Sequence, residues 1–260
     1  MLPVLQIGPF AVPTPALLLL IGLWAAMTAG ARYTLRFNIE SKKIDDLILL
    51  TILAGLIGAK VFYVMRFPKV FIANPAGMLS LNPSLFDFSA GFLVAGIAFL
   101  VIMQRKKLPI WSTLDALVIP LSVMWIFVGL SHFASGAVYG TPTALPWAIR
   151  LWGAERHPTQ LYETLLALSV FLVMMRSLNR KEVENQPKAL AGAIFLRFCI
   201  LLSLVWIFLE TFRADTLILI GNLRTVQVIS LLVLGTSFWF QDKLRKNSEA
   251  EEREENVSGA

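Results

Sequence analysis

Long apolar runs, separated by short charged segments, dominate the chain. Seven of these runs come close to the length of about 17 to 25 residues that crosses a bilayer as a helix. They predict an all-α integral membrane protein with about seven transmembrane helices, at residues 11–31, 44–65, 87–103, 113–134, 158–176, 189–210 and 225–241. Residues 1–246 are then a single transmembrane domain. The charged residues 247–260 lack apolar anchors, which predicts a disordered cytoplasmic tail.

The basic residues predict the orientation of these helices. Fifteen of them fall in the loops on one side together with the tail, and six fall in the alternate loops. Because loops rich in Lys and Arg remain in the cytoplasm, we expect the N-terminus outside and the C-terminus in the cytoplasm. The loop 135–157, which contains Gly136, Gly140, Pro142 and Pro146, is then an external, turn-rich segment.

Composition supports this class and excludes others. The chain is 57% hydrophobic and 15% charged, well below the charged fraction of soluble domains. The net charge of +6 does not predict nucleic-acid binding, because the charges lie between apolar runs. A single cysteine, Cys199, permits no disulfide within one chain. No metal-ligand or serine-hydrolase motif is present, and we expect no metal and no cofactor.

The densest polar cluster on an apolar run is the stretch 156–163, Arg-His-Pro-Thr-Gln-Leu-Tyr-Glu. On a helix, His157, Gln160 and Glu163 would share one face, since they are three residues apart. Polar groups at a membrane helix are costly unless they are paired or face a cavity. A polar site at the external surface is therefore favoured. The alternative is a helix start anchored at the headgroups by Arg156 and Tyr162.

A few other charged or polar groups lie inside the predicted helices. Lys60 lies mid-helix, and an ammonium there needs a carboxylate, a water-filled cavity or an anionic ligand such as a phosphate. Glu210 and Arg213 are three residues apart and either form a simple ion pair or belong to a site. Asp115 suits a cap of its own helix. The second histidine, His132, is by itself best interpreted as a buried imidazole bonded to a carbonyl.

At this point the chain resembles the bacterial prolipoprotein diacylglyceryl transferase family. The stretch 156–163 is similar to that family's Arg-His-Pro-Ser-Gln-Leu-Tyr-Glu signature. Further similarities follow in the family's order, at Ile7-Gly8-Pro9, Gly58-Ala59-Lys60 with Tyr63, Phe88 to Gly91, Asp115 to Gly140, Glu210 to Arg213, and Gln227 with Ser230. The resemblance covers almost the whole chain. It implies transfer of diacylglyceryl from phosphatidylglycerol to the lipobox cysteine of exported prolipoproteins, at the outer face of the plasma membrane.

The chain departs from the family pattern at several positions. Family arginines are replaced by Gly129 and Trp206, a family asparagine by His132, and a family glutamate by Ala137. The family histidine expected to act on the thiol is Ser89, and a tyrosine is Pro15.

The reaction needs a base to form a thiolate and cations to hold the departing glycerol phosphate. Our candidate catalytic residues are His132 as the base, Arg156, His157 and Glu163. Candidate substrate-binding residues are Lys60, Gly140, Arg150, Gln160, Tyr162, Glu210 and Arg213. Lys60, Arg150 and Arg156 would hold phosphate.

Two other functions remain open. The first is a non-catalytic paralogue that binds phosphatidylglycerol, another anionic phospholipid or a lipoprotein on the same scaffold. The second is an unrelated small-molecule transporter, which the absence of two-halved symmetry and the ordered motifs disfavour.

Overall fold

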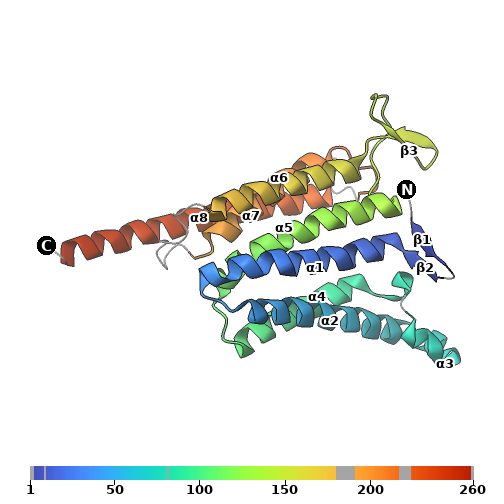
Figure 1. Cartoon of the computed structure of the whole chain (residues 1–260), viewed down its shortest axis with the longest axis horizontal. Coiled ribbons are helices and arrows are strands. Elements are labelled where there is room, and N and C mark those ends of the chain that lie inside the picture. Colours follow the sequence, from blue (N-terminus) through green and yellow to red (C-terminus); the bar gives the residue numbers. More distant parts are fainter. Residues whose placement is uncertain (1–2, 9, 81, 180–190, 217–223, 259–260) are drawn as a thin grey trace. The chain divides into compact units, whose positions relative to one another are not determined.

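The computed structural model describes residues 3–8, 10–80, 82–179, 191–216 and 224–258 (Figure 1). Two compact units are formed, one by residues 1–37 with 114–260 and one by residues 38–113. The α-helices are α1 (Thr14–Thr34), α2 (Ser41–Arg66), α3 (Pro68–Ala73), α4 (Phe88–Arg105), α5 (Ile110–Ser135), α6 (Thr159–Asn179), α7 (Ala193–Glu210) and α8 (Thr225–Ser258). The strands β1 (Val4–Ile7) and β2 (Phe10–Pro13) form one hairpin, and β3 (Ile149–Leu151) and β4 (Ala154–Arg156) form another.

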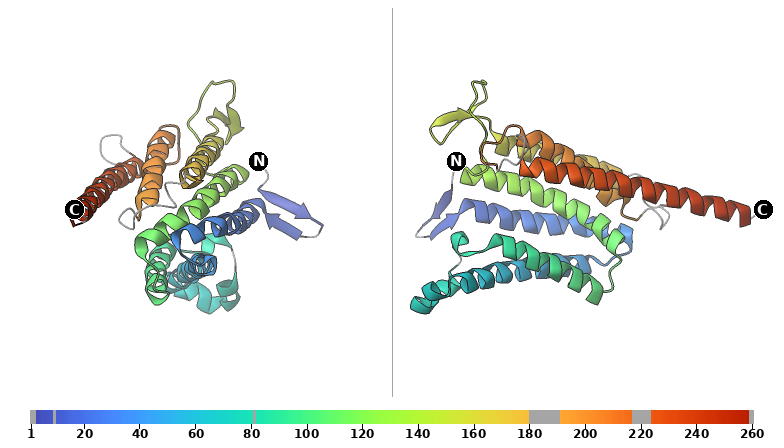
Figure 2. Two further views of the ribbon diagram at one scale, coloured as in Figure 1. Left: turned by 60° about the vertical axis from the view of Figure 1, so that its left-hand side comes forward. Right: turned by 180° about the vertical axis from the view of Figure 1, so that it is seen from behind.

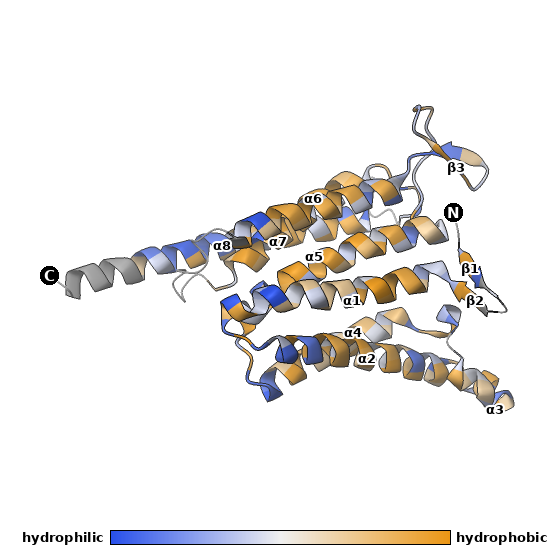
Figure 3. Cartoon of the chain, in the orientation of Figure 1, coloured by the Kyte–Doolittle hydropathy of each residue, from blue (hydrophilic) through white to orange (hydrophobic). Residues whose placement is uncertain are grey.

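The predicted fold class, an all-α integral membrane protein, is confirmed. Within the described residues, six helices are long and apolar enough to cross a membrane, namely α1 extended to Phe37, α2, α4, α5, α6 to Leu178, and α7. Figure 3 shows the apolar residues concentrated along these helices. The seventh apolar run forms the first half of α8, which is not among the six. The total of seven spans and the orientation of the termini stay predictions.

Helix α5 is the centre of the larger unit. Its most apolar 18-residue window is 61% buried, whereas the same windows of the other five helices are 11–39% buried. Its side chains pack in one apolar core with residues of α1, α6 and α7, among them Ala26, Val118, Trp125, Ala167 and Phe198. This burial explains why α5 is apolar on all sides, a pattern typical of a helix surrounded by others.

Asp115 ties α5 to the start of α7. Its carboxylate accepts hydrogen bonds from the backbone N–H groups of Gly192 (2.6 Å) and Phe195 (2.7 Å). The first turn of a helix has N–H groups without partners inside the helix, and an acidic side chain suits them. The expectation that Asp115 caps its own helix is therefore wrong, because the N-terminus that it caps belongs to a helix nearly eighty residues later.

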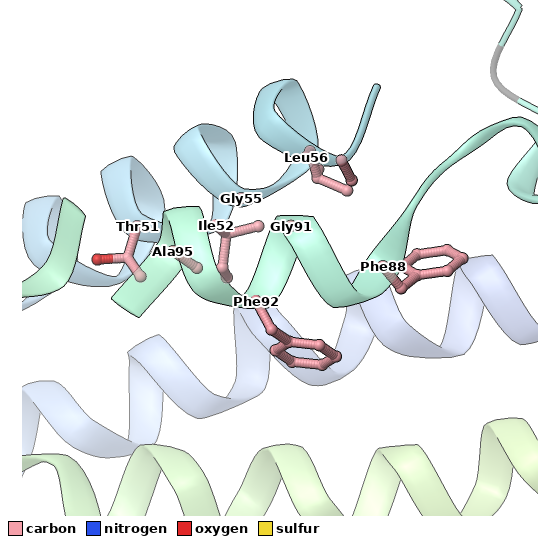
Figure 4. A pocket seen from close by; sticks show the side chains of 9 residues that line it. Thr51, Ile52, Gly55, Leu56, Phe88, Gly91, Phe92 and Ala95 are labelled. Carbon is pink, nitrogen blue, oxygen red and sulfur yellow. The ribbon is translucent and has the colours of Figure 1, made fainter. Parts of the chain in front are cut away.

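The smaller unit depends on close packing between α2 and α4 (Figure 4). A Cβ built on Gly91 would lie 2.7 Å from the Cβ of Ala59 and 2.9 Å from the carbonyl oxygen of Gly55. Small residues on both helices allow the backbones to approach, as at many membrane helix contacts. An apolar groove of about 400 Å³, lined by Phe88 and Phe92 among others, lies along this contact.

The loop 135–157 and the charged tail both contain regular secondary structure. The predicted turn-rich loop contains the β3–β4 hairpin, which turns at Trp152 and Gly153, both with positive φ. At the other end, α8 continues as helix through Ser258 rather than ending near residue 241 (Figure 2, right). The division into a 1–246 domain and a disordered tail stays a prediction. The basic residues Arg180, Lys181 and Lys188 lie outside the described residues.

The contact between α1 and α5 provides a test of the packing. A Cβ on Gly30 would lie 2.5 Å from Cγ of Pro120, and the proline ring has little freedom to move. We expect Gly30→Ala to destabilise the protein by about 1–3 kcal/mol through overpacking. The measurement is thermal unfolding in detergent.

Gly96→Ala is the matched control, because nothing lies within 4 Å of a Cβ at Gly96. Alanine has the higher helix propensity, so this variant should be as stable as the parent or more stable. Equal unfolding temperatures for the two variants would contradict the close contact at Gly30.

Candidate functional site

A histidine–carboxylate pair lies where α5 ends and α6 begins. Nδ1 of His132 lies 2.9 Å from Oε2 of Glu163. The other carboxylate oxygen of Glu163 accepts a hydrogen bond from Nε1 of Trp125, at 3.2 Å. The side chain of Glu163 is 2% exposed, whereas that of His132 is 27% exposed. A buried carboxylate thus holds one nitrogen of an imidazole that remains accessible.

Aromatic rings connect this pair to a second charged cluster. Trp125 stacks on Trp206 with ring centroids 6.0 Å apart, and the guanidinium of Arg213 lies 5.1 Å from the Trp206 centroid. Arg213 donates a hydrogen bond to Oε1 of Glu210 at 3.1 Å. Arg224 in turn donates to the backbone oxygens of Glu210 and Arg213. The Glu210–Arg213 pair is therefore built into the turn that follows α7.

Several buried polar atoms in this region have no hydrogen-bond partner among the described residues. They include Oε2 of Glu210 and Oε1 of Gln160. Buried polar atoms are nearly always bonded in native proteins, so these two oxygens are able to accept a donor from a bound group. A void in the same region, lined by Val138, Thr159, Glu163, Leu209 and Arg213, is too narrow for a water molecule.

The stretch 156–163 does not present one polar face. Helix α6 begins at Thr159, so His157 precedes the helix and points elsewhere. The ring centroids of His157 and Phe212 are 5.1 Å apart, and Nδ1 of His157 lies 3.4 Å from the hydroxyl of Tyr162. Gln160 instead donates to the carbonyl of Ala137 at 2.8 Å. The expectation that His157 shares a face with Gln160 and Glu163 is wrong, because the helix starts after Pro158.

His157 and Tyr162 lie on an apolar groove of about 440 Å³. Its other lining residues are Leu145, Trp147, Leu165, Leu166, Phe208 and Phe212. The indole of Trp147 donates a hydrogen bond to the Tyr162 hydroxyl at 2.8 Å. The lining of the groove is therefore almost entirely apolar, and the Trp147 indole and the Tyr162 hydroxyl bond to each other.

Arg156 and Gly140 hold the loop between α5 and α6 in place. Arg156 donates to the carbonyls of Leu151 (3.0 Å) and Gly140 (3.1 Å), and its guanidinium lies over the Tyr139 ring. A Cβ on Gly140 would lie 2.4 Å from the carbonyl oxygen of His157, so only glycine fits there. Thr159 adds a hydrogen bond to the carbonyl of Val138. The signature stretch thus anchors the loop that precedes it.

Two predicted phosphate ligands are not part of this cluster. Lys60 belongs to the smaller unit, where its ammonium donates to the carbonyls of Gly77 (3.2 Å) and Ser80 (2.8 Å) and faces the Phe86 ring. Arg150 is exposed on β3, opposite Glu155. The partners of the Lys60 ammonium among the described residues are thus backbone carbonyls and aromatic rings, and its role as a phosphate ligand stays a prediction.

Gly129 of α5 packs closely against α6. A Cβ on Gly129 would lie 2.5 Å from Oγ1 and 3.0 Å from the backbone nitrogen of Thr164. Sequence reasoning also missed Trp125 and Arg224 as partners of the site. Trp125 is one hydrophobic residue in an apolar run, and only the pairing of α5 with α6 brings it to Glu163.

The fold and the site define a multi-helix membrane protein with an accessible histidine paired to a buried carboxylate at one end of a helical unit. The comparisons with known proteins are more specific. The chain belongs to the prolipoprotein diacylglyceryl transferase family, whose model matches residues 3–241.

The chain is similar along most of its length to curated members of that family. It is 26% identical over 230 residues to the phosphatidylglycerol–prolipoprotein diacylglyceryl transferase of Finegoldia magna, with 88% of this chain and 90% of the relative covered. The transferase of the same name from Synechococcus elongatus is 26% identical, over 88% of this chain and 82% of the relative. The transferase of Solidesulfovibrio magneticus is 27% identical, over 90% of this chain and 91% of the relative.

Arg156 allows a test of how the loop is held. In Arg156→Gln, two hydrogen bonds from a charged group to carbonyls are lost, each of them contributing about 1.5–3 kcal/mol. We expect backbone amides of residues 140–157 to exchange hydrogen at least about tenfold faster, as measured by mass spectrometry.

Arg150→Gln removes the same charge from an exposed position of the same hairpin and should leave exchange unchanged. If Arg150→Gln accelerated exchange as much as Arg156→Gln did, net charge rather than the two hydrogen bonds would hold the loop.

Proposed function

We propose that this chain transfers a diacylglyceryl group from an anionic phospholipid to a cysteine thiol, with His132 as the general base. The observation that carries the proposal is the His132–Glu163 pair, with Trp125 on the second carboxylate oxygen. A buried carboxylate that holds Nδ1 of an imidazole selects the tautomer in which Nε2 has the free lone pair. Nε2 is then the atom that accepts a proton from the substrate.

The chemistry proceeds as a substitution at carbon. Nε2 of His132 takes the thiol proton, and the thiolate attacks the glycerol carbon that carries the phosphate ester. The C–O bond breaks, a C–S thioether forms, and glycerol phosphate leaves with the bonding electrons. The imidazolium beside Glu163 can return its proton to the leaving group.

The substrates follow from the family. Its characterised relatives are named for phosphatidylglycerol and prolipoprotein, and we assign the same two substrates to this chain. The site of action is the outer face of the bacterial plasma membrane, where exported prolipoproteins arrive. The apolar groove bounded by His157 and Tyr162 suits an acyl chain.

The cations that would hold phosphate differ in availability. Arg150 is exposed and opposite a single carboxylate, so its guanidinium is able to turn towards a ligand. Arg156 and Lys60 have donors committed to carbonyl oxygens. Arg213 has its charge balanced by Glu210. Among the predicted ligands in the larger unit, we therefore assign Arg150 as the phosphate contact, with Arg156, Gly140, Gln160 and Tyr162 shaping the site.

A second candidate function is phospholipid or lipoprotein binding without transfer. The observation that favours it is the packing at Gly129, where the hydroxyl and the backbone of Thr164 on α6 leave little room for a larger side chain. The void beside Glu163 is too narrow for a water molecule, and the stacked rings of Trp125 and Trp206 occupy the region next to the pair. Loss of a bidentate arginine removes much of the stabilisation that a departing phosphate needs.

An assay with phosphatidylglycerol and a lipobox peptide decides between the two. We expect purified protein to form the thioether product, and His132→Ala and Glu163→Gln each to lower the rate by roughly 10²–10⁴-fold, the range for loss of a general base. Product is quantified by mass spectrometry of the peptide.

Ser169→Ala is the control, because Ser169 lies on the exposed side of the same helix as Glu163 and bonds only to its own helix. Its rate should match that of the parent. Absence of product from folded protein that still binds phosphatidylglycerol would replace the transferase by the binding protein. Product that forms equally well in His132→Ala would remove His132 from the mechanism.

A further inference from the structure

A charged pocket of about 420 Å³ lies between α7 and α8, at the end of the larger unit away from His132. It is lined by Ala193, Arg197, Phe238, Gln241, Asp242, Leu244 and Arg245. Thirteen residues separate Arg197 from Glu210 on α7. At 1.5 Å per residue the pocket is about 20 Å from the transferase site. The two regions therefore take different ligands or different molecules of one ligand.

Arg197 is an exposed cation inside an apolar span. Among the residues that the structure describes, no carboxylate oxygen lies within ion-pair distance of it. An arginine in such a place is retained at low cost only where it meets water or an anion. It lies one turn into α7, close enough to the membrane surface for its side chain to reach the headgroup layer.

The acidic residues near the pocket are occupied by cations of their own helix. Asp242 lies 2.6 Å from Lys246 and 3.2 Å from Arg245, and Glu249 lies 3.8 Å from Arg245. The hydrogen bond from Lys246 and the nearby positive charges hold the pKa of Asp242 below its usual range, so it is ionised at neutral pH. With Arg197 and Lys243 included, the positive charges outnumber the negative ones.

The sequence of α8 places the pocket at the boundary between hydrocarbon and headgroups. The aromatic residues Phe238, Trp239 and Phe240 are followed directly by a charged run from Asp242 to Lys246. Trp239 is 60% exposed, and Lys243 lies over its ring. Tryptophans gather at the membrane interface, and basic pockets between membrane helices bind anionic headgroups. This depth favours a lipid over a free anion.

We propose that Arg197 and Arg245 bind the phosphate of an anionic phospholipid in the leaflet at this end of the helices, with Phe238 and Leu244 against its glycerol and acyl carbons. The guanidinium groups, from two different helices, face one pocket and match a phosphodiester. The lipid would hold α8 against α7 by bridging the two helices. The site is independent of the proposed transfer reaction.

The test uses the full chain in nanodiscs and an anionic phospholipid with a photoreactive group next to its phosphate. Labelled residues are located by peptide mass spectrometry, which separates this pocket from the transferase site. We expect labelling in residues 193–197 and 238–245. Each arginine near an anionic headgroup contributes a factor of about five in affinity, so Arg197→Gln with Arg245→Gln should weaken labelling about 25-fold.

The control variants distinguish a specific headgroup site from non-specific attraction of the anionic lipid to a positively charged protein. Arg105→Gln removes the same charge at the end of α4, outside the pocket, and should label like the parent. Arg197→Lys with Arg245→Lys should keep most of the labelling, which separates loss of charge from loss of fold. Phosphatidylglycerol should compete, whereas phosphatidylcholine and inorganic phosphate should not.

Three results would overturn the proposal. The first is unchanged labelling of residues 193–197 and 238–245 in the double glutamine variant. The second is a loss of labelling in Arg105→Gln as large as that in the double variant. The third is displacement of the probe by millimolar inorganic phosphate. The last would identify a site for a free anion instead of a lipid. Failure of thioether formation would leave this test unaffected.

Discussion

A buried carboxylate in a membrane helix needs its hydrogen bonds inside the protein, and Glu163 satisfies this requirement through α5. Its two oxygens meet Trp125 and His132, seven residues apart and therefore on one face of that helix. Together with the Gln160 and Thr159 contacts to the loop at 137–138, these bonds determine how α6 and the loop between α5 and α6 are placed. The groove at His157 and the Glu210–Arg213 turn are built around that arrangement.

Each end of the larger unit satisfies its charges differently. At the end with Glu163, the carboxylates are buried and each has a side-chain partner: Glu163 has His132, and Glu210 has Arg213. At the other end, Asp115 is bonded to backbone N–H groups, and the cations of α8 are exposed. Water and headgroups satisfy exposed charges, whereas buried ones depend on partners in the protein. The first arrangement suits a reaction site, and the second suits a membrane surface.

Close packing at Gly129 brings α5 against α6. A Cβ on Gly129 would lie 2.5 Å from Oγ1 and 3.0 Å from the backbone nitrogen of Thr164. Trp206 joins Arg213 to Trp125 through its ring. The His132–Glu163 pair is the polar element beside these packed side chains.

The sequence by itself determined the membrane class, the positions of the long helices and the family, because apolar length and a contiguous signature are local properties. It also identified His132 and Glu163 as candidates, since charged and imidazole groups are rare in apolar runs. Only the tertiary structure decided that these two form a pair, that Asp115 caps α7, and that Lys60 and Arg156 bond to carbonyls. Those partners lie between 5 and 80 residues away along the chain. Which partner a side chain contacts depends on how the helices and loops pack against one another. The periodicity of residues within one helix does not predict this packing.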